Sequence, residues 1–412
     1  MMLGRSSPSY TVRGYGVRGY RAPRPGAFAG RPRSLLSRAF ARNSVLRQMD
    51  WVLVVVVCGL SAIGVLLVWS ATQPSLLAAG ENPHTYMVKQ ALWAAIGLIL
   101  MLAVSFADTR RLRSWTPFVY GVTVLGLIAV FATHAINGAH AWINLPGGFQ
   151  VEPSEFAKVA LILGLATVFS RPRWRGEPGV RSVLLALGCA APLLALVVKE
   201  PALGVALVLA VVTATMIVLS GTKLRVIAGL AAIVGGAVAL VGGTHLLKSY
   251  QLTRFTSFLH PSADLAGAGY NAAQAKIAVG SGGMFGTGLF HGSIVAGNYV
   301  PSQQTDFIFT VAGEELGFVG TITIVVLLSI VIVRAIRIAA RADDLFGVLI
   351  ASGVAIWFAF QSFVNIGMTI GIMPITGLPL PFVSYGGSAI FADMIAIGML
   401  QSARRHHSVF TD

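Results

Sequence analysis

Charged residues are scarce in this 412-residue chain, where Asp, Glu, Lys and Arg together make up only 11%. Soluble domains carry roughly 25% charged residues, so this composition excludes an ordinary soluble fold. Cysteine is almost absent, and Cys58 and Cys189 both lie inside apolar runs, which argues against a disulfide framework or a cysteine zinc site. The eight His are scattered and form no HExxH motif, so a zinc hydrolase has no support. Hydrophobic residues, by contrast, make up 55% of the chain and indicate a polytopic membrane protein.

Acidic residues are missing from residues 1–49, which hold ten Arg among Pro, Gly, Ser and Tyr. This composition resembles an organellar transit peptide. The alternative is a disordered basic tail in the cytoplasm that lies against anionic lipid headgroups. We favour the tail, because basic residues here also orient the first membrane span.

Long apolar runs follow this tail and predict an all-α membrane protein with about ten transmembrane helices. The runs cover residues 51–72, 88–106, 116–134, 154–169, 181–198, 201–220, 224–247, 306–333, 344–372 and 383–403. The run over 154–169 is short and carries Glu155 and Lys158, which makes it the weakest on hydropathy alone. The adjacent runs around Lys199-Glu200-Pro201 could instead form one long broken helix.

The distribution of basic residues predicts which side of the membrane each connection faces. With the N-terminus inside, twenty-four Lys and Arg fall on the cytoplasmic side and five on the other, a strong positive-inside bias. The membrane domain then covers residues 50–405, a short cytoplasmic tail covers 406–412, and a large loop over 248–305 faces out between spans 7 and 8. The net charge of +15 therefore reflects topology, and we expect no nucleic-acid binding. No inverted repeat of the kind found in many transporters is visible.

The segment from Asn137 to Lys158 contains polar groups that hydropathy does not explain. Its AWI and GF pieces predict an amphipathic element on the outer membrane surface, anchored by Trp142. Ser154 is positioned to cap the helix that follows. Glu155 and Lys158 are three residues apart, so they share a helix face and can pair within the membrane. The pair either locks the fold by neutralising itself, or Lys158 tunes or positions an external carboxylate.

The external loop carries Arg254 and Lys276, two of the few cations expected on that side. An anionic lipid headgroup could be held by them and by N–H groups of the Gly280–Gly283 turn, which includes Gly282 and Gly283. The alternative is that these glycines serve only tight turns and close packing. The run matches neither GxGxxG after a strand nor a GxxxxGK[ST] loop, so nucleotide binding is not expected.

Asp306 lies where this loop meets the next span, a costly place for a carboxylate. Near a helix N-terminus the dipole favours its ionised form, so Asp306 could be simply an N-cap or a functional group. Glu314 and Glu315 lie two to three turns deeper, and we expect at least one to face the bundle interior in a structural role.

The stretch from Asn365 to Ser388 breaks an apolar run with Pro374, Pro379 and Pro381. Irregular backbone at membrane depth occurs only where protein or a cavity covers it. The stretch therefore predicts either a wall of a polar site or a hinge.

Four long motifs in the same order are similar to those of the SEDS family of cell-wall polymerases, over roughly residues 50–405. They are WI…PSEFAK (142–158), RF…P…GYN…QAKIAVGSGGMFGTGL (254–289), TDFIF…GEELGF (305–318) and NIGM…GLPLPFVSYGGS (365–388). The Gly-Leu-Phe-His-Gly segment and the overall length resemble the RodA-like branch more than the FtsW-like branch. Three regions depart from the family pattern, since Ala141 replaces a common Arg, EPALG with Ala202 replaces QPDLG, and Ser302 and Gln304 replace an acid and a His.

The resemblance implies a ten-span fold in a bacterial plasma membrane and a peptidoglycan glycosyltransferase that polymerises lipid II during cell-wall elongation and cell-shape maintenance. It also implies a class B penicillin-binding protein as the partner that supplies transpeptidation. The family's essential loop aspartate falls on Asp306, its Glu and Lys on Glu155 and Lys158, and its loop tryptophan on Trp142.

Our hypothesis from these residues is that Asp306 is the general base for the attacking sugar hydroxyl. Arg254 and Lys276 are candidates for the pyrophosphate leaving group, and a divalent cation, Mg²⁺ or Mn²⁺, is another source of positive charge. Gly282, Gly283 and Ser384 complete the candidate substrate-binding residues. Two alternatives are a lipid II flippase that uses the Glu155–Lys158 site and the broken helices, and a non-catalytic scaffold whose loop docks partners.

Overall fold

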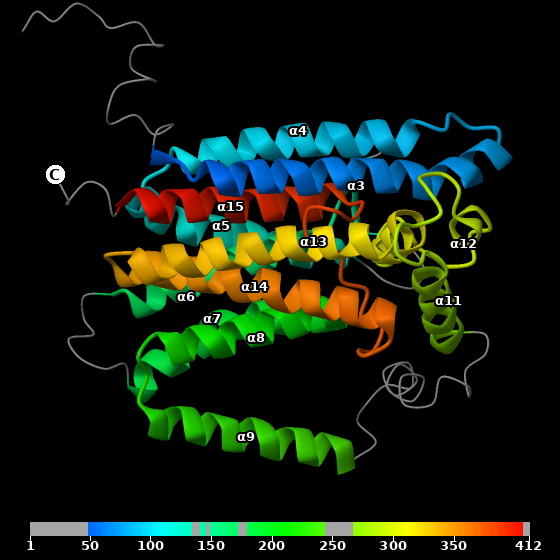
Figure 1. Cartoon of the computed structure of the whole chain (residues 1–412). Helices are drawn as coiled ribbons and strands as arrows, with labels where there is room; N and C mark the ends of the chain where they lie inside the picture. The colour runs from blue at the N-terminus through cyan, green and yellow to red at the C-terminus, as the bar shows by residue number, and fades with distance from the viewer. Residues whose placement is uncertain (1–47, 134–140, 146–148, 172–178, 244–266, 407–412) are drawn as a thin grey trace, which may run out of the picture. The chain divides into compact units, whose positions relative to one another are not determined.

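The computed structural model describes residues 48–133, 141–145, 149–171, 179–243 and 267–406. Within these ranges the chain is mostly helical, which confirms the helical part of the predicted fold class (Figure 1). Ten helices have 17 residues or more: α3 (Trp51–Ala78), α4 (Thr85–Ser105), α5 (Thr109–Val130), α6 (Pro153–Phe169), α7 (Val180–Lys199), α8 (Leu203–Leu219), α9 (Leu224–Gly243), α13 (Ile308–Arg341), α14 (Leu345–Ile370) and α15 (Gly387–His406). Two shorter helices, α11 (Ala268–Ser281) and α12 (Ser293–Ala296), precede α13.

Each of the ten longer helices of the described chain falls on one of the ten apolar runs. Six of them, α3, α4, α5, α7, α13 and α14, are long and apolar enough to cross a membrane, and α8 is a shorter apolar helix. The possible long helix around Glu200 is not formed, because a turn separates α7 from α8.

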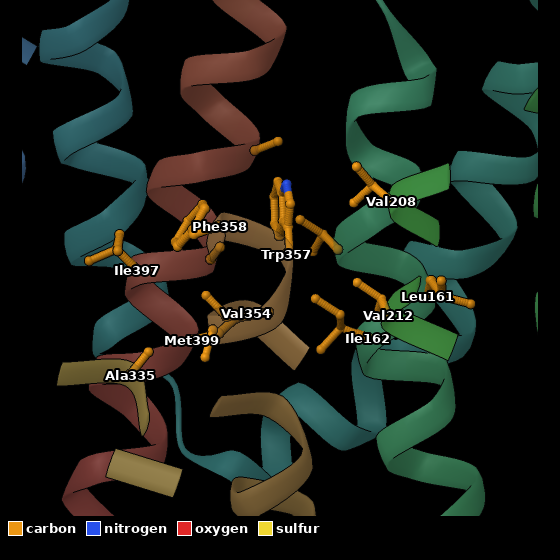
Figure 2. Close-up of a cluster of buried hydrophobic side chains, with 14 of the residues drawn as sticks. Leu161, Ile162, Val208, Val212, Ala335, Val354, Trp357, Phe358, Ile397 and Met399 are labelled. Atoms are coloured by element: carbon orange, nitrogen blue, oxygen red, sulfur yellow. The ribbon is translucent and has the colours of Figure 1, made fainter. Parts of the chain in front are cut away.

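The weakest of the predicted spans, α6, is the most enclosed part of the bundle. Fifteen of its 17 residues are buried, and it packs against α5, α7, α8, α14 and α15. Figure 2 shows Leu161 and Ile162 of α6 in an apolar cluster with Val208 and Val212 of α8 and with Trp357 of α14. Because protein surrounds α6 on all sides, its charged residues Glu155 and Lys158 face other helices, so a short span with two charges can lie inside the bundle.

The segment before α6 is a short pair of strands. The sequence predicted an amphipathic element here without specifying strands, and the segment forms an antiparallel hairpin of β1 (Ile143–Leu145) and β2 (Phe149–Val151), with Ile143 paired to Val151. Pairing of the two strands satisfies backbone groups of these short apolar pieces. The predicted cap is wrong: Glu152 is the N-cap residue, and the Ser154 hydroxyl donates to Glu152 Oε1 at 2.8 Å.

The helix α13 is bent at Gly317, whose φ of 66° and ψ of −162° lie outside the helical region. A positive φ favours glycine, and the bend leaves main-chain groups without helical partners. The glycine-rich segment after α11 supplies partners for them: the Phe318 amide donates to Gly283 O at 2.9 Å, and the Gly288 amide donates to Glu315 O at 3.0 Å. The loop is thus hydrogen-bonded to α13.

The two buried glutamates of α13 strengthen this attachment through their side chains. Glu314 accepts from the amides of Ile294 and Val295 at 2.8 and 3.0 Å, at the start of α12. Glu315 Oε1 accepts from the Phe290 amide of the loop at 3.2 Å and from the Ser70 hydroxyl of α3 at 2.6 Å. Both glutamates therefore have the structural role that was expected for them.

Candidate active site

Asp306 lies in the turn that leads into α13, and its residue is half-buried. The helix begins at Ile308 with Phe307 as the N-cap, so Asp306 is not the cap residue. Asn365 of α14 donates from Nδ2 to the main-chain oxygen of Asp306 at 2.8 Å. A Cβ added to Gly377, in the proline-containing stretch, would lie 3.4 Å from Asp306 Oδ2. The carboxylate thus stands beside that stretch.

Lys158 and Glu155 form the ion pair that their spacing predicts, with Lys158 Nζ 2.7 Å from Glu155 Oε2. Both side chains are almost completely buried. Lys158 Nζ also donates to Gln361 Oε1 at 3.0 Å and lies 4.7 Å from the centre of the Trp357 ring. A buried charge is tolerated only when it is paired and hydrogen-bonded, and Lys158 meets both conditions.

The irregular segment between α14 and α15 connects these two groups. Gln361 Nε2 donates to Pro379 O at 2.8 Å, and Asn365 Nδ2 donates to Leu378 O at 2.6 Å. Gln361 and Asn365 are four residues apart and therefore lie on one face of α14. One helix face thus fixes the broken segment, contacts Lys158 at one end and holds Asp306 at the other. These contacts favour a wall of a polar site over a hinge, the two interpretations that the sequence left open for the proline-containing stretch, and the choice between them stays a prediction.

Two carboxyl groups that the sequence reasoning did not assign to the site belong to the same surroundings. Burial, followed by the charge of Glu155, raises the pKa of Glu152 to about 7, and the charge of Asp306 also contributes. Burial, followed by the charge of Glu152, raises the pKa of Glu200 to about 8. Glu200 is 1% exposed, and neither of its carboxyl oxygens has a hydrogen-bond partner. The sequence signal that could have identified Glu200 is the EPALG motif, in which Glu200 stands where the family pattern QPDLG has Gln.

The remaining candidate residues are distributed over different parts of the site. Lys276 is exposed on α11, and its side chain lies against Gly371, directly after α14. Ser384 is buried, and its hydroxyl accepts from the Leu380 amide at 2.8 Å. Trp142 is half-buried, and its carbonyl accepts from the Thr133 hydroxyl at 3.2 Å. Arg254 lies outside the described residues.

The glycine turn packs against α13. A Cβ added to Gly282 would overlap the main-chain oxygen of Gly313. Gly283 has a φ of 55° and accepts from the Phe318 amide. These contacts give both glycines a packing role, and headgroup binding by this turn stays a prediction.

The described residues were also compared with the usual requirements of a metal site. Across the residues that the structure describes, no group of three or more His, Cys, Asp or Glu side chains could hold one. Lys276 is one side chain in this part of the chain that could supply positive charge to a phosphate-bearing ligand, and a divalent cation stays a prediction.

An apolar groove lies next to the hairpin that precedes Glu152. Its cavity volume is about 480 Å³, and its lining comes from α4, α5, α6, α15 and both strands. Ile143, Val151 and Pro153 line the groove close to Glu152, and Phe118 and Leu163 line it elsewhere. The groove has the chemistry to hold a hydrocarbon chain beside the polar site.

Comparisons with known proteins cover almost the whole described chain. Residues 50–409 match a family model of FtsW, RodA and SpoVE proteins described as "Cell cycle protein". The chain is 37% identical over 361 residues to "Probable peptidoglycan glycosyltransferase FtsW" of Trichlorobacter lovleyi, covering 86% of this chain and 93% of that protein. It is 34% identical over 368 residues to "Peptidoglycan glycosyltransferase MrdB" of Escherichia coli K12, covering 88% of this chain and 95% of that protein.

A solved structure is similar as well. The structure described as "Structural coordination of polymerization and crosslinking by a peptidoglycan synthase complex" superposes with a TM-score of 0.72 at 30% identity. The superposition covers 88% of this chain and 99% of that chain.

Proposed function

The chain belongs to the family of FtsW, RodA and SpoVE cell cycle proteins, and on this premise we propose that it polymerises lipid II into glycan strands. It is a multi-pass membrane protein and a peptidoglycan glycosyltransferase, the activity that its relatives carry in their names. The observation that most supports polymerisation by this site is the position of Asp306: Asn365 holds its backbone, one turn along α14 from Gln361, which contacts Lys158 of the buried Glu155–Lys158 pair. We propose that this polymerisation serves cell-wall elongation and cell-shape maintenance, because the chain resembles the RodA-like branch.

The proposed topology has ten crossings, both termini in the cytoplasm and residues 248–305 outside. The ten helices of at least 17 residues support it, as does the positive-inside bias of the connections. Helices α6, α8 and α15 have much of their surface buried, so they can be short or polar and still lie at membrane depth.

In the proposed reaction, Asp306 acts as general base. Its carboxylate takes the proton from the acceptor sugar hydroxyl as that oxygen bonds to the donor's anomeric carbon. The bond from that carbon to the pyrophosphate oxygen breaks, and the polyprenyl pyrophosphate leaves with the electron pair. A single displacement converts an α-linked donor to a β-linked product without a covalent enzyme intermediate. General-base assistance is typically worth about 10²–10⁴-fold in rate.

The developing charge on the leaving group requires cations. Lys276 and Arg254 are the proposed ones, with backbone groups near Gly282 and Gly283 as further donors. The Glu155–Lys158 pair, together with Trp142 and Ser384, is proposed to shape the polar wall against which the sugars bind. The apolar groove beside the hairpin is proposed to hold a polyprenyl chain, because its lining is almost wholly hydrocarbon.

The proposed partner is a class B penicillin-binding protein that cross-links the new strand. The similar solved structure is described as a peptidoglycan synthase complex that coordinates polymerisation and crosslinking. That description supports an arrangement in which this membrane domain polymerises and another protein supplies transpeptidation.

Purified protein in detergent with lipid II tests the proposal. A polymerase makes glycan strands although no membrane separates two compartments, whereas a lipid II flippase makes none. A docking scaffold also makes none. Glycan formation that disappears in the Asp306→Asn variant supports the proposal, and the absence of glycan from well-folded wild-type protein with its partner contradicts it.

A further inference from the structure

A basic cavity of about 360 Å³ lies at the end of the bundle where α3 begins and where α13 and α15 end. In Figure 1 this is the end opposite α11 and α12. Four arginines line it, Arg334, Arg337 and Arg341 from α13 and Arg404 from α15, together with Asp50. No step of the proposed polymerisation uses these residues.

The cavity is built by contacts among three helices. Asp50 is the N-cap residue of α3. Its Oδ2 lies 3.3 Å from Nη1 of Arg334 and 3.3 Å from Nη1 of Arg404. Gln401 Oε1 of α15 accepts a hydrogen bond from the Asp50 amide at 2.8 Å, and Gln401 Nε2 donates to the Asp50 carbonyl at 3.1 Å. Since Asp50 is only 5% exposed, these contacts fix the three helix ends.

The charges in the cavity do not balance. Arg334, Arg337 and Arg341 follow each other at spacings of three and four, which puts them on one face of α13. Asp50 is the single carboxylate of the lining, and it pairs with Arg334 and Arg404. Within the described chain no carboxylate lies at ion-pair distance from Arg337 or Arg341. The positive-inside rule explains why arginines occur on this side, but it does not explain their convergence on one cavity.

We propose that this cavity binds the phosphate group of an anionic phospholipid. The guanidinium group presents paired N–H donors that match phosphate oxygens, and Arg337 and Arg341 have such donors available. The cytoplasmic leaflet, which this face meets in the proposed topology, is rich in anionic headgroups.

A lipid fits better than a soluble acidic segment because an apolar surface continues from the arginines. Val326, Val333 and Ile336 on α13 are 50%, 43% and 54% exposed, and Val333 lies four residues before Arg337, on the same face of the helix. Acyl chains can lie along this surface while the headgroup occupies the cavity. The bound lipid then holds α3, α13 and α15 together and stabilises the folded state by mass action.

Lipid binding to the full-length protein tests the proposal. The probes are phosphatidylglycerol, phosphatidylcholine, inorganic phosphate and a polyglutamate peptide, each added to protein in neutral detergent. Native mass spectrometry measures bound lipid, and thermal unfolding measures stability. The test variant is Arg337→Gln/Arg341→Gln, in which both altered side chains are exposed. The matched control is Arg110→Gln/Arg111→Gln, two exposed arginines at the start of α5 outside the cavity.

We expect phosphatidylglycerol to bind and to raise the thermal midpoint of the wild type and the control, and phosphatidylcholine to do neither. In the Arg337/Arg341 variant, the affinity should fall about 30-fold, with an unchanged midpoint in the absence of lipid. Competition by inorganic phosphate supports recognition of the phosphate group itself. Equal losses of lipid affinity in both variants would overturn the site, as would protection by a polyglutamate peptide without binding of phosphatidylglycerol.

Discussion

Asn365 of α14 fixes the backbone of Asp306, donating from Nδ2 to the Asp306 carbonyl at 2.8 Å. The same nitrogen donates to Leu378 O at 2.6 Å, so one buried amide joins the turn before α13 to the irregular segment before α15. A base must be held within a fraction of an ångström to act efficiently. Asn365 is therefore a positioning residue for Asp306.

Replacing Asn365 with Ala should lower glycan polymerisation by about 10²-fold, because misplacement of a reacting group by about 1 Å can cost that much. The loss should appear mainly in kcat, since the substitution moves the base and leaves lipid contacts in place. The measurement is the rate of glycan formation from lipid II. Thr323→Ala, which removes an exposed hydroxyl on α13, is the control. A normal kcat in folded Asn365→Ala protein would contradict the positioning role.

Replacing Lys158 with Met should destabilise the protein by about 3–5 kcal/mol, because Glu155 is left as an unpaired buried charge. The double variant Glu155→Gln/Lys158→Met should recover much of that loss. Thermal unfolding in detergent of the wild type, both single variants and the double variant gives the coupling between the two side chains. Additive effects in this cycle would show that the pair does not act as a unit.

Glu200 should make stability depend on pH. Its folded pKa of about 8 lies above the ordinary value of 4.5, so between these pH values the folded state holds a proton that the unfolded state has released. The free energy of unfolding should therefore fall as the pH rises through this window. Glu200→Gln should flatten the fall and raise the thermal midpoint at pH 8 relative to the wild type. The exposed Glu81→Gln variant is the control, and parallel wild-type and Glu200→Gln profiles would refute the prediction.

Gly282→Ala should lower the thermal midpoint, because the added Cβ would overlap the main-chain oxygen of Gly313. Gly280→Ala is the matched control, since an added Cβ there meets nothing within 4 Å. In a helix, replacing Gly with Ala gains about 0.5–1 kcal/mol, so the control should be neutral or slightly stabilised. A loss of the same size in both variants would mean that close packing of the loop on α13 is not the cause.

The sequence predicted the helices well because apolar runs of this length have few other stable forms. It also predicted the Glu155–Lys158 pair, since a spacing of three on a helix brings side chains together. It did not predict the hairpin before α6, where three-residue strands carry too short a pattern to distinguish from an amphipathic surface segment. The sequence pointed to Ser154 as the cap because serine is a preferred N-cap residue, but α6 begins one residue earlier, at Pro153, with Glu152 at the N-cap.

Local sequence patterns could not predict the long-range hydrogen bonds that define the site. Asn365 is separated from Asp306 by 59 positions, and Lys158 is separated from Gln361 by 203. Only the fold brings such pairs together, and no periodicity in the chain indicates them. Glu200 was visible as an acid in a family motif, but its burial and its proximity to Glu152 depend on how α7 and α8 pack.

The most direct test of the account is the rate at which purified Asp306→Asn protein polymerises lipid II in detergent. The amide keeps the size of the side chain and removes its capacity to accept a proton. We predict that glycan formation falls by about 10²-fold or more, while the thermal midpoint and partner binding stay at the wild-type level. Asp108→Asn, at an exposed carboxylate before α5, should polymerise normally. Polymerisation by Asp306→Asn at the wild-type rate would contradict the assignment of Asp306 as the general base.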